Sequence, residues 1–199
     1  MKNRIAEISR RTSETDIFCR LDLDGTGICQ IETGVGFFDH VLESFARHGK
    51  FDLILKCAGD LKTGAHHSIE DCALVLGESF KKAAGEKIGI ERFGFEKISA
   101  EEILPMDEAI AFLAADFSGR PFLKFAAKFK NEKVADFPTE MVAHFLQSFS
   151  VAAGLNLHAK IDGENDHHQI EVLFKSLGRV LRKILKISGA KIPSTKGSL

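Results

Sequence analysis

The stretch His66-His-Ser-Ile-Glu70 returns later in the chain as His167-His-Gln-Ile-Glu171, with a single difference. The likeness extends in both directions from these two stretches. The other matched pairs are His40/His144, Leu42/Leu146, Ser44/Ser148, Phe45/Phe149, Leu53/Leu157, Lys56/Lys160, Gly59/Gly163, Leu76/Leu177, Gly77/Gly178 and Lys82/Lys183. Unrelated segments would share only about two or three identities over such a window. The sequence therefore predicts a fold made by duplication of one half.

The sequence pattern of each half predicts the same short series of helices and strands. Apolar residues alternate through Phe51, Leu53, Leu55 and Cys57, and again through residues 155–161, which is the period of a strand with one buried face. Helices are predicted over residues 38–47, 66–84, 139–152 and 167–186, with Gly85 and Gly189 as stops. Hairpins are predicted for residues 15–32 around Asp24-Gly25 and for residues 108–129 around Ser118-Gly119.

These elements predict an α+β fold of two ββαβα halves, 1–90 and 91–199, joined in one compact domain. In each half a mostly antiparallel sheet is covered by two helices on one face, and the halves share a core.

The bulk composition narrows the class of protein. A chain of 199 residues with 44% apolar residues can bury a substantial core, and 27 basic against 28 acidic residues give no general attraction for nucleic acid or a membrane surface. The amino terminus leads into no signal-peptide core, so we expect a cytoplasmic protein. The four cysteines form no Cys-x-x-Cys pair and are expected to be buried free thiols. The chain has no Tyr and no Trp.

Histidine and glutamate residues at matched positions predict a metal site. One His-His pair is usually a solvated surface feature, but here two copies recur, each with a Glu three residues later and a matched His upstream. Imidazole and carboxylate ligands without thiolate suit Mn, Fe, Zn or Ni.

Helix geometry restricts how these ligands can be shared. His66 and Glu70 lie on one face of a helix, whereas His67 points about 100° away from His66. One helix start therefore cannot give both imidazoles to one ion, and we expect sites between elements of different halves or different subunits. Asn165 and Asp166 are capping residue types for the second helix start, and Ser68 or Thr63 could serve in the first.

Several motifs in order closely resemble those of the imidazoleglycerol-phosphate dehydratase family of histidine biosynthesis. They are Thr33-Gly-Val-Gly-Phe-Phe-Asp-His40, Ala65-His-His-Ser-Ile-Glu-Asp71, Asp116-Phe-Ser-Gly-Arg-Pro121, Asn165-Asp-His-His-Gln-Ile-Glu171 and Pro193-Ser-Thr-Lys-Gly197. The resemblance runs from about Arg11 to Gly197. Gly64-Ala65 depart from the acidic residues that many relatives carry before the first His-His, so support for His66 or His67 is expected to differ.

The resemblance implies a manganese enzyme with two Mn²⁺ ions per active site and a duplicated fold of the ribosomal protein S5 domain 2-like type. It further implies an assembly of 24 subunits built from trimers, with active sites at subunit interfaces and a small phosphate substrate. The implied metal ligands are His40, His66, His67, Glu70, His144, His167, His168 and Glu171.

The implied reaction converts imidazole glycerol phosphate to imidazole acetol phosphate. A metal can hold the substrate ring as an imidazolate, which expels the neighbouring hydroxyl to give a diazafulvene-like intermediate. By resemblance Glu14 handles the side-chain proton, and Glu70 and Glu171 also count as catalytic. The candidates for binding the phosphate are Glu14, as a substrate contact, with Arg92, Arg120, Lys175, Ser194 and Lys196.

Two other interpretations compete with this one. Asp22-Leu-Asp-Gly-Thr26 matches the nucleophile motif of haloacid-dehalogenase-type phosphatases, although Arg20 interrupts the apolar strand that should precede it. Alternatively, the chain could be an assembly protein that uses metals only to join subunits, which requires that no cations converge on a substrate.

Overall fold

The structure, a computed structural model, describes residues 4–94 and 103–199. Residues 1–3, which belong to the amino terminus discussed above, lie outside these ranges. The first half contains β1 (Ile5–Arg11), β2 (Thr15–Asp22), β3 (Cys29–Glu32), α1 (Gly36–Gly49), β4 (Asp52–Gly59), a short 3-10 turn (Leu61–Thr63) and α2 (His66–Ala84). The second contains β5 (Ile103–Met106), β6 (Ala109–Asp116), β7 (Phe122–Ala126), β8 (Lys133–Val134), β9 (Phe137–Pro138), α3 (Met141–Ala153), β10 (Asn156–Asp162) and α4 (Asp166–Ile184).

The two halves have the same sheet topology, which agrees with the predicted duplication. The first sheet has the order β1-β2-β4-β3 and the second has the order β5-β6-β10-β7. In each sheet the first three strands are antiparallel, while the last pairs parallel to its neighbour. The α+β prediction and the mostly antiparallel sheets are therefore confirmed.

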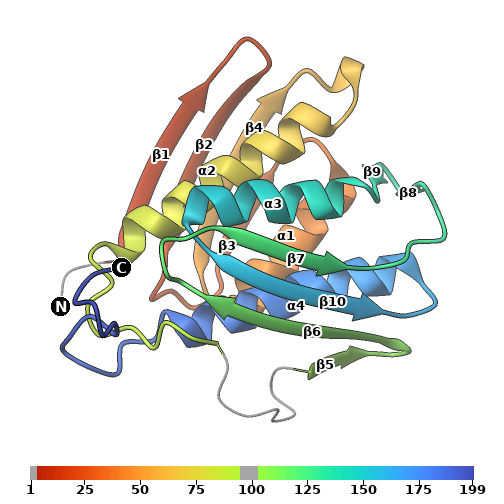
Figure 1. Cartoon of the computed structure of the whole chain (residues 1–199). Helices are drawn as coiled ribbons and strands as arrows, with labels where there is room; N and C mark the ends of the chain where they lie inside the picture. The colour runs from red at the N-terminus through yellow and green to blue at the C-terminus, as the bar shows by residue number, and fades with distance from the viewer. Residues whose placement is uncertain (1–3, 95–102) are drawn as a thin grey trace.

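The four helices lie between the two sheets and pack in pairs that cross from one half to the other (Figure 1). α2 packs on α3, and α1 packs on α4. Close approach is possible because a glycine stands at each crossing: a Cβ on Gly77 would lie 2.7 Å from the Phe149 carbonyl oxygen, and one on Gly178 would lie 2.3 Å from that of Phe45. The halves thus share one core, which fully buried phenylalanines such as Phe38 and Phe145 fill.

Both predicted hairpins are wrong, because the strands that flank each turn do not pair. β2 and β3 lie on opposite sides of β4, and β6 and β7 lie on opposite sides of β10. The first connection crosses the end of β4, where Asp52 Oδ1 accepts hydrogen bonds from the backbone N–H groups of Thr26, Gly27 and Ile28. The true hairpins are β1–β2 and β5–β6. The first half is therefore βββαβα rather than ββαβα, and the second half has the same order with the small β8–β9 pair inserted before α3.

The helix ends are partly as predicted. α2 spans the predicted residues and Gly85 caps it with a positive φ of 57°. Asn165 caps α4, accepting a hydrogen bond from the backbone N–H of His167, but Ser68 and Thr63 cap nothing at α2, whose N-cap is Ala65. α4 ends at Ile184, before Gly189, because Leu185 already closes its last turn.

Two further observations concern composition. The four cysteines are free; Cys19 and Cys72 are buried, whereas Cys29 and Cys57 are only partly buried. In the described part of the chain no helix is both long enough and apolar enough to span a membrane.

Candidate metal centre

Six of the matched histidine and glutamate residues form two compact clusters. The α4 cluster consists of His40, His167 and Glu171, and the α2 cluster consists of His66, Glu70 and His144. Within each cluster, one candidate ligand atom from each residue lies within 4.8 Å of the others. Each cluster therefore brings two imidazoles and one carboxylate to one point.

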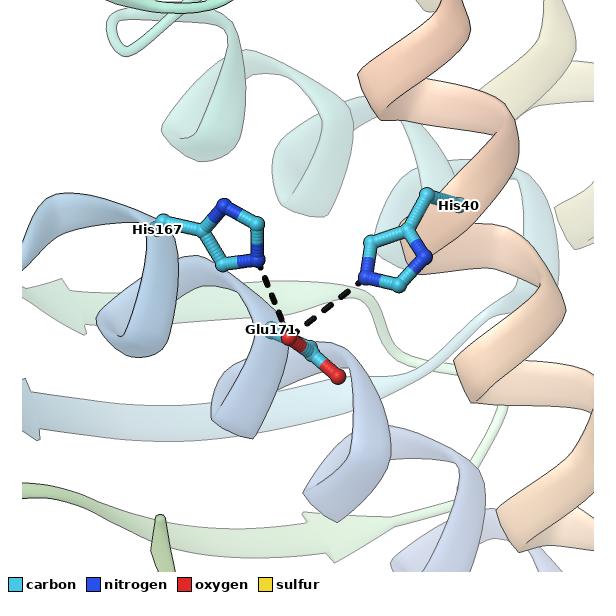
Figure 2. Close-up of side chains that lie close together, drawn as sticks. All are labelled: His40, His167 and Glu171. Atoms are coloured by element: carbon cyan, nitrogen blue, oxygen red, sulfur yellow. Dashed lines mark hydrogen bonds and ion pairs between the residues drawn. The ribbon is translucent and has the colours of Figure 1, made fainter. Parts of the chain in front are cut away.

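In the α4 cluster both imidazoles face one carboxylate oxygen (Figure 2). His40 Nε2 lies 3.4 Å and His167 Nε2 lies 3.2 Å from Glu171 Oε2. The other oxygen, Oε1, lies 2.8 Å from Lys175 Nζ. Burial alone would raise the pKa of Glu171, but the hydrogen bonds from Lys175 and His40 outweigh it, and the net pKa is lowered. Glu171 is held as a carboxylate.

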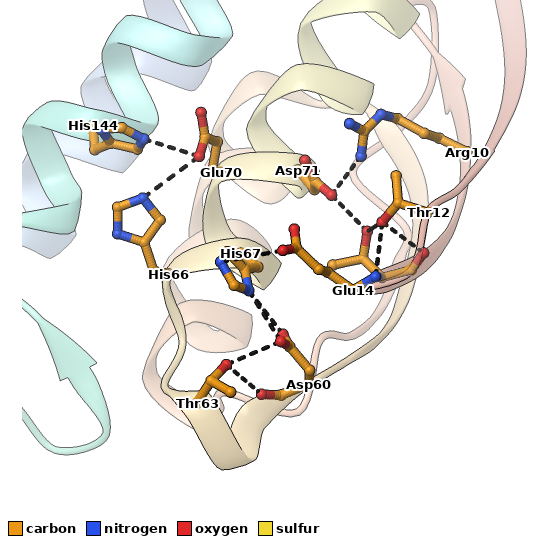
Figure 3. A network of polar contacts seen from close by, with 11 residues as sticks. Arg10, Thr12, Glu14, Asp60, Thr63, His66, His67, Glu70, Asp71 and His144 are labelled. Atoms are coloured by element: carbon orange, nitrogen blue, oxygen red, sulfur yellow. Dashed lines mark hydrogen bonds and ion pairs between the residues drawn. The ribbon is translucent and has the colours of Figure 1, made fainter.

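The α2 cluster repeats this geometry (Figure 3). His66 Nε2 lies 3.5 Å and His144 Nε2 lies 3.2 Å from Glu70 Oε2. His144 Nε2 is buried and, despite its closeness to Glu70, has no hydrogen bond of acceptable geometry within the described residues. Buried polar atoms are normally hydrogen-bonded, and a bound cation would give this ring nitrogen the partner that it lacks.

The clusters owe their positions to the crossing helices. A His and a Glu come from the first two turns of α2 or α4, and the remaining His comes from the helix of the other half that packs there. α1 is also fixed across the halves, since the Asp136 carboxylate accepts hydrogen bonds from the backbone N–H groups of Gly36 (2.6 Å) and Phe37 (3.0 Å). Helix geometry allowed sites between halves or between subunits, and both clusters lie between the two halves of one chain.

His67 and His168 lie outside both clusters. His67 Nδ1 is 3.1 Å from both carboxylate oxygens of Asp60, and His168 Nδ1 is 2.9 Å from Glu108 Oε2. These hydrogen bonds raise the pKa of each imidazole, and the bond from His168 lowers the pKa of Glu108 to about 2. The Nδ1 partners leave each Nε2 atom as the nitrogen available to a ligand.

Glu14 lies beside His67, in the turn between β1 and β2 (Figure 3). Its Oε1 atom is 3.7 Å from His67 Nε2, and about half of its side chain (49%) is exposed. Thr12 Oγ1 accepts hydrogen bonds from the backbone N–H groups of Glu14 and Thr15, which fix this turn. The carboxylate is therefore held in place by its backbone while remaining accessible.

The candidates for phosphate binding do not converge on the clusters within one chain. Lys175 adjoins the α4 cluster, but Arg92 lies at the other end of α4, where its backbone N–H binds the Ile184 carbonyl. At 1.5 Å per residue that end is roughly 20 Å from Glu171. The Arg92 guanidinium is already paired with Asp116 and with the Pro193 carbonyl.

The other phosphate candidates belong to this far end. The Arg92 contact with Pro193 brings Ser194 close, and Ser194 Oγ accepts a hydrogen bond from the backbone N–H of Lys196. Arg120 is exposed in the loop whose Gly119 approaches the last residue of the chain. These residues form a second basic region, separate from both clusters.

Sequence reasoning missed the acidic partners Asp60, Glu108 and Asp136. Each comes from a loop or turn whose position depends on the tertiary fold. Glu108 occupies the position equivalent to Glu14, but that equivalence follows from the strand pairing. The structure also gives the phosphatase interpretation no support, since Asp24 is paired with Arg4 and its backbone N–H donates to Asp22.

Comparison with known proteins assigns the chain to a family. The family model described as imidazoleglycerol-phosphate dehydratase matches residues 33–181. The chain belongs to the imidazoleglycerol-phosphate dehydratase family. It is 50% identical over 200 residues to a protein of that name from Methylorubrum extorquens, with 98% of this chain and 100% of the relative covered.

Two further relatives give the extent of the match. The histidine biosynthesis bifunctional protein HisB of Actinobacillus pleuropneumoniae is 53% identical, but this chain, 98% covered, spans only 52% of its length. The crystal structure of imidazoleglycerol-phosphate dehydratase from Staphylococcus aureus superposes with a TM-score of 0.81 at 32% identity, covering 92% of this chain and 99% of that one. The family is thus one of dehydratases, and the fold extends over nearly the whole chain.

Proposed function

We propose that this chain is a cytoplasmic, manganese-dependent imidazoleglycerol-phosphate dehydratase that converts D-erythro-imidazole glycerol phosphate to imidazole acetol phosphate in histidine biosynthesis. The observation that carries the proposal is the pair of matched clusters, each with two imidazoles and one carboxylate. Membership of a dehydratase family supports the reaction, and the nitrogen and oxygen donors suit Mn²⁺.

The donor set fits one divalent ion per cluster. Glu171 is held ionised next to two imidazoles, and His144 Nε2 lacks a hydrogen-bond partner among the described residues. His40, His167 and Glu171 would hold one ion, and His66, Glu70 and His144 the other. When bound, the ions would supply Lewis acidity to the imidazole ring of the substrate.

Proton transfer falls to Glu14 in this proposal. Its carboxylate is accessible, its backbone is fixed by Thr12, and it lies beside the outward-facing imidazole of His67. A carboxylate in that place can take the proton from the side-chain carbon adjacent to the one that loses hydroxide, which gives the enol. It can later return a proton to the carbon next to the ring as the enol becomes the ketone. Loss of hydroxide as water and tautomerisation of the enol give the ketone.

A complete active site requires more than one copy of the chain. His67 and His168 face away from the clusters of their own chain, and the basic region around Arg92 lies roughly 20 Å from Glu171 along α4. We propose that His67 and His168 complete the metal sites of neighbouring subunits. Arg92, Arg120, Ser194 and Lys196, with Lys175, would bind the substrate phosphate in a homo-oligomer of 24 subunits built from trimers.

The test is an assay for imidazole acetol phosphate on chelator-treated protein, with and without added Mn²⁺. We expect activity to disappear on chelation and to return with Mn²⁺. Glu14→Gln should keep metal content and assembly but lower kcat by about 10²-fold or more, the usual contribution of a general base. If Glu14→Gln turned over at the wild-type rate, Glu14 would have no part in the reaction. Metal-dependent assembly without turnover would instead favour an assembly protein in which metals only join subunits.

A further inference from the structure

The turns before β2 and before β6 carry equivalent carboxylates. Leu53 and Leu157 are matched in the repeat, and they pair with Leu21 on β2 and with Ala115 on β6. Counting back along both strands by the same number of residues leads to Glu14 and Glu108, each of which immediately precedes its strand. Glu14 and Glu108 therefore occupy equivalent positions in the two halves.

The two carboxylates have different surroundings. Among the described residues the Glu14 carboxylate has one close polar contact, Oε1 at 3.7 Å from His67 Nε2, and its side chain is half exposed. Both carboxylate oxygens of Glu108 have partners. Oε2 lies 2.9 Å from His168 Nδ1. Oε1 accepts a hydrogen bond of 2.8 Å from the backbone N–H of Asn165, the N-cap of α4. The Glu14 carboxylate therefore remains accessible to a substrate, whereas the Glu108 carboxylate links the start of α4 to the His168 imidazole.

The orientation of His67 comes from a different element. Asp60, in the connection between β4 and α2, occupies the Nδ1 side of His67 and also accepts a hydrogen bond from the Thr63 hydroxyl (Figure 3). His67 and His168 are matched residues, yet Asp60 and Glu108 are not. Both histidines therefore have a carboxylate on Nδ1, but the two carboxylates come from different positions in the fold.

The turn that holds Glu14 is fastened by a polar network that the second half lacks. Asp71 accepts a hydrogen bond of 2.6 Å from Thr15 Oγ1 and forms an ion pair with Arg10. At the matched positions the second half has Leu104, Ala109 and Val172. In the first half this side-chain network positions the turn, so the Glu14 side chain need not do so.

We propose that Glu108 is the positioning residue of His168, fixing the ring through Nδ1 so that Nε2 projects as a metal ligand. Asp60 does the same for His67, and this leaves Glu14 free for proton transfer. The inference rests on the proposed function in one respect, namely that His67 and His168 are ligands. A carboxylate on the far nitrogen fixes the tautomer and the ring direction of a ligating histidine, and losing it typically weakens metal binding by about 10- to 100-fold.

The experiment compares variants of the full chain by Mn²⁺ competition against a chelator and by ¹⁵N NMR of the histidine rings in the metal-free protein. We expect Glu108→Ala to weaken one class of Mn²⁺ site by about 10- to 100-fold and to mix the tautomers of His168. Asp60→Ala should do the same to the other class and to His67. Glu108→Gln keeps an acceptor for the Nδ1 proton, so it should recover most of the affinity lost in Glu108→Ala.

Asp107→Asn is the matched control, because Asp107 lies 3.8 Å from His168 Nε2 but does not touch Nδ1. It should leave both Mn²⁺ affinities and the His168 tautomer as in wild type. A loss of affinity in Asp107→Asn as large as that in Glu108→Ala would reduce the effect to local charge and overturn the proposal. Wild-type affinity and an unchanged tautomer in Glu108→Ala would overturn it too.

The results that would contradict the proposed function differ from those that would contradict the role of Glu108. Wild-type protein that binds no Mn²⁺ or forms no imidazole acetol phosphate would remove the dehydratase proposal. The tautomer of His168 in Glu108→Ala would still report on whether Glu108 orients the ring.

Discussion

Replacing Asp71 tests how the first half holds the turn that carries Glu14. Asp71 is buried, with 8% of its surface exposed, and joins α2 to the Thr15 hydroxyl of β2 and to Arg10 of β1. Asp71→Val removes both contacts without creating a large cavity. We expect the variant to be less stable than wild type and to place Glu14 less accurately.

The magnitude follows from what is left unpaired. A hydrogen bond to a charged group contributes about 1.5–3 kcal/mol, and breaking a fully buried ion pair costs about 3–5 kcal/mol. Arg10, however, is 35% exposed and can turn partly to water, so its share lies well below the buried limit. We therefore expect Asp71→Val to lower the free energy of unfolding by about 2–3 kcal/mol.

The second half supplies a matched control. Arg10→Leu, Thr15→Ala and Asp71→Val together copy Leu104, Ala109 and Val172, so none of these three side chains is left with an unpaired polar group. Thr12 Oγ1 loses its 3.3 Å contact with Thr15 Oγ1 but keeps the hydrogen bonds from two backbone N–H groups. Replacing all the partners of a buried polar contact by apolar groups is often nearly neutral. The triple variant should return to within about 1 kcal/mol of wild-type stability, while kcat stays low because the Glu14 turn has lost its fastening.

Urea unfolding at a fixed subunit concentration measures both changes, and a dehydratase assay measures kcat. The three substitutions should be strongly non-additive, with the triple variant more stable than Asp71→Val alone. A triple variant as unstable as Asp71→Val, or one with wild-type kcat, would refute this prediction.

Two further predictions concern the helix starts and pH. Asp136→Ala removes the acceptor at the start of α1 and should lower the free energy of unfolding by about 1 kcal/mol, with Asp136→Asn losing less; urea midpoints that match wild type would contradict this. Asp60 and Glu108 raise the pKa of His67 and His168 above the ordinary 6.5, and metal binding needs neutral imidazole. Protons should therefore compete with metal from higher pH than for a free imidazole, so Mn²⁺ content and subunit assembly should fall together on acidification; equal mass distributions at about pH 8 and pH 5 would contradict that coupling. In the metal-free chain the same raised pKa values add stability below pH 6.5 that is lost as pH rises through them.

Most of the fold could be predicted from local periodicity, but strand pairing could not. The alternation at Leu53 and Leu55 and the helix over His66–Ala84 depend on residues close in sequence, and the structure confirms them. The pairing of β3 with β4 depends on a loop that Asp52 holds from far along the chain, and a turn signal such as Asp24-Gly25 cannot report it. β1 was missed because among its residues only Ala6 is fully buried.

For the candidate site, too, the features that depend on one helix could be predicted, whereas those that depend on the tertiary fold could not. Duplication and helical spacing were enough to predict that His66 and Glu70 act together and that His67 points elsewhere, because both follow from the geometry of one helix. Which helix supplies the third residue of each cluster depends on how α1 and α3 cross between halves. The roles of Asp60 and Glu108 depend on contacts between loop residues and helix starts, which the spacing of residues in the sequence does not predict.

The crossing of helices between halves has a consequence for the origin of the chain. Neither half contains all three residues of either cluster, so a half-length ancestor could have assembled them only by pairing with a second copy of itself around a twofold axis. In such a pair every substitution would have appeared at both centres at once. In a single chain the two halves can differ, as the surroundings of Glu14 and Glu108 do at equivalent positions.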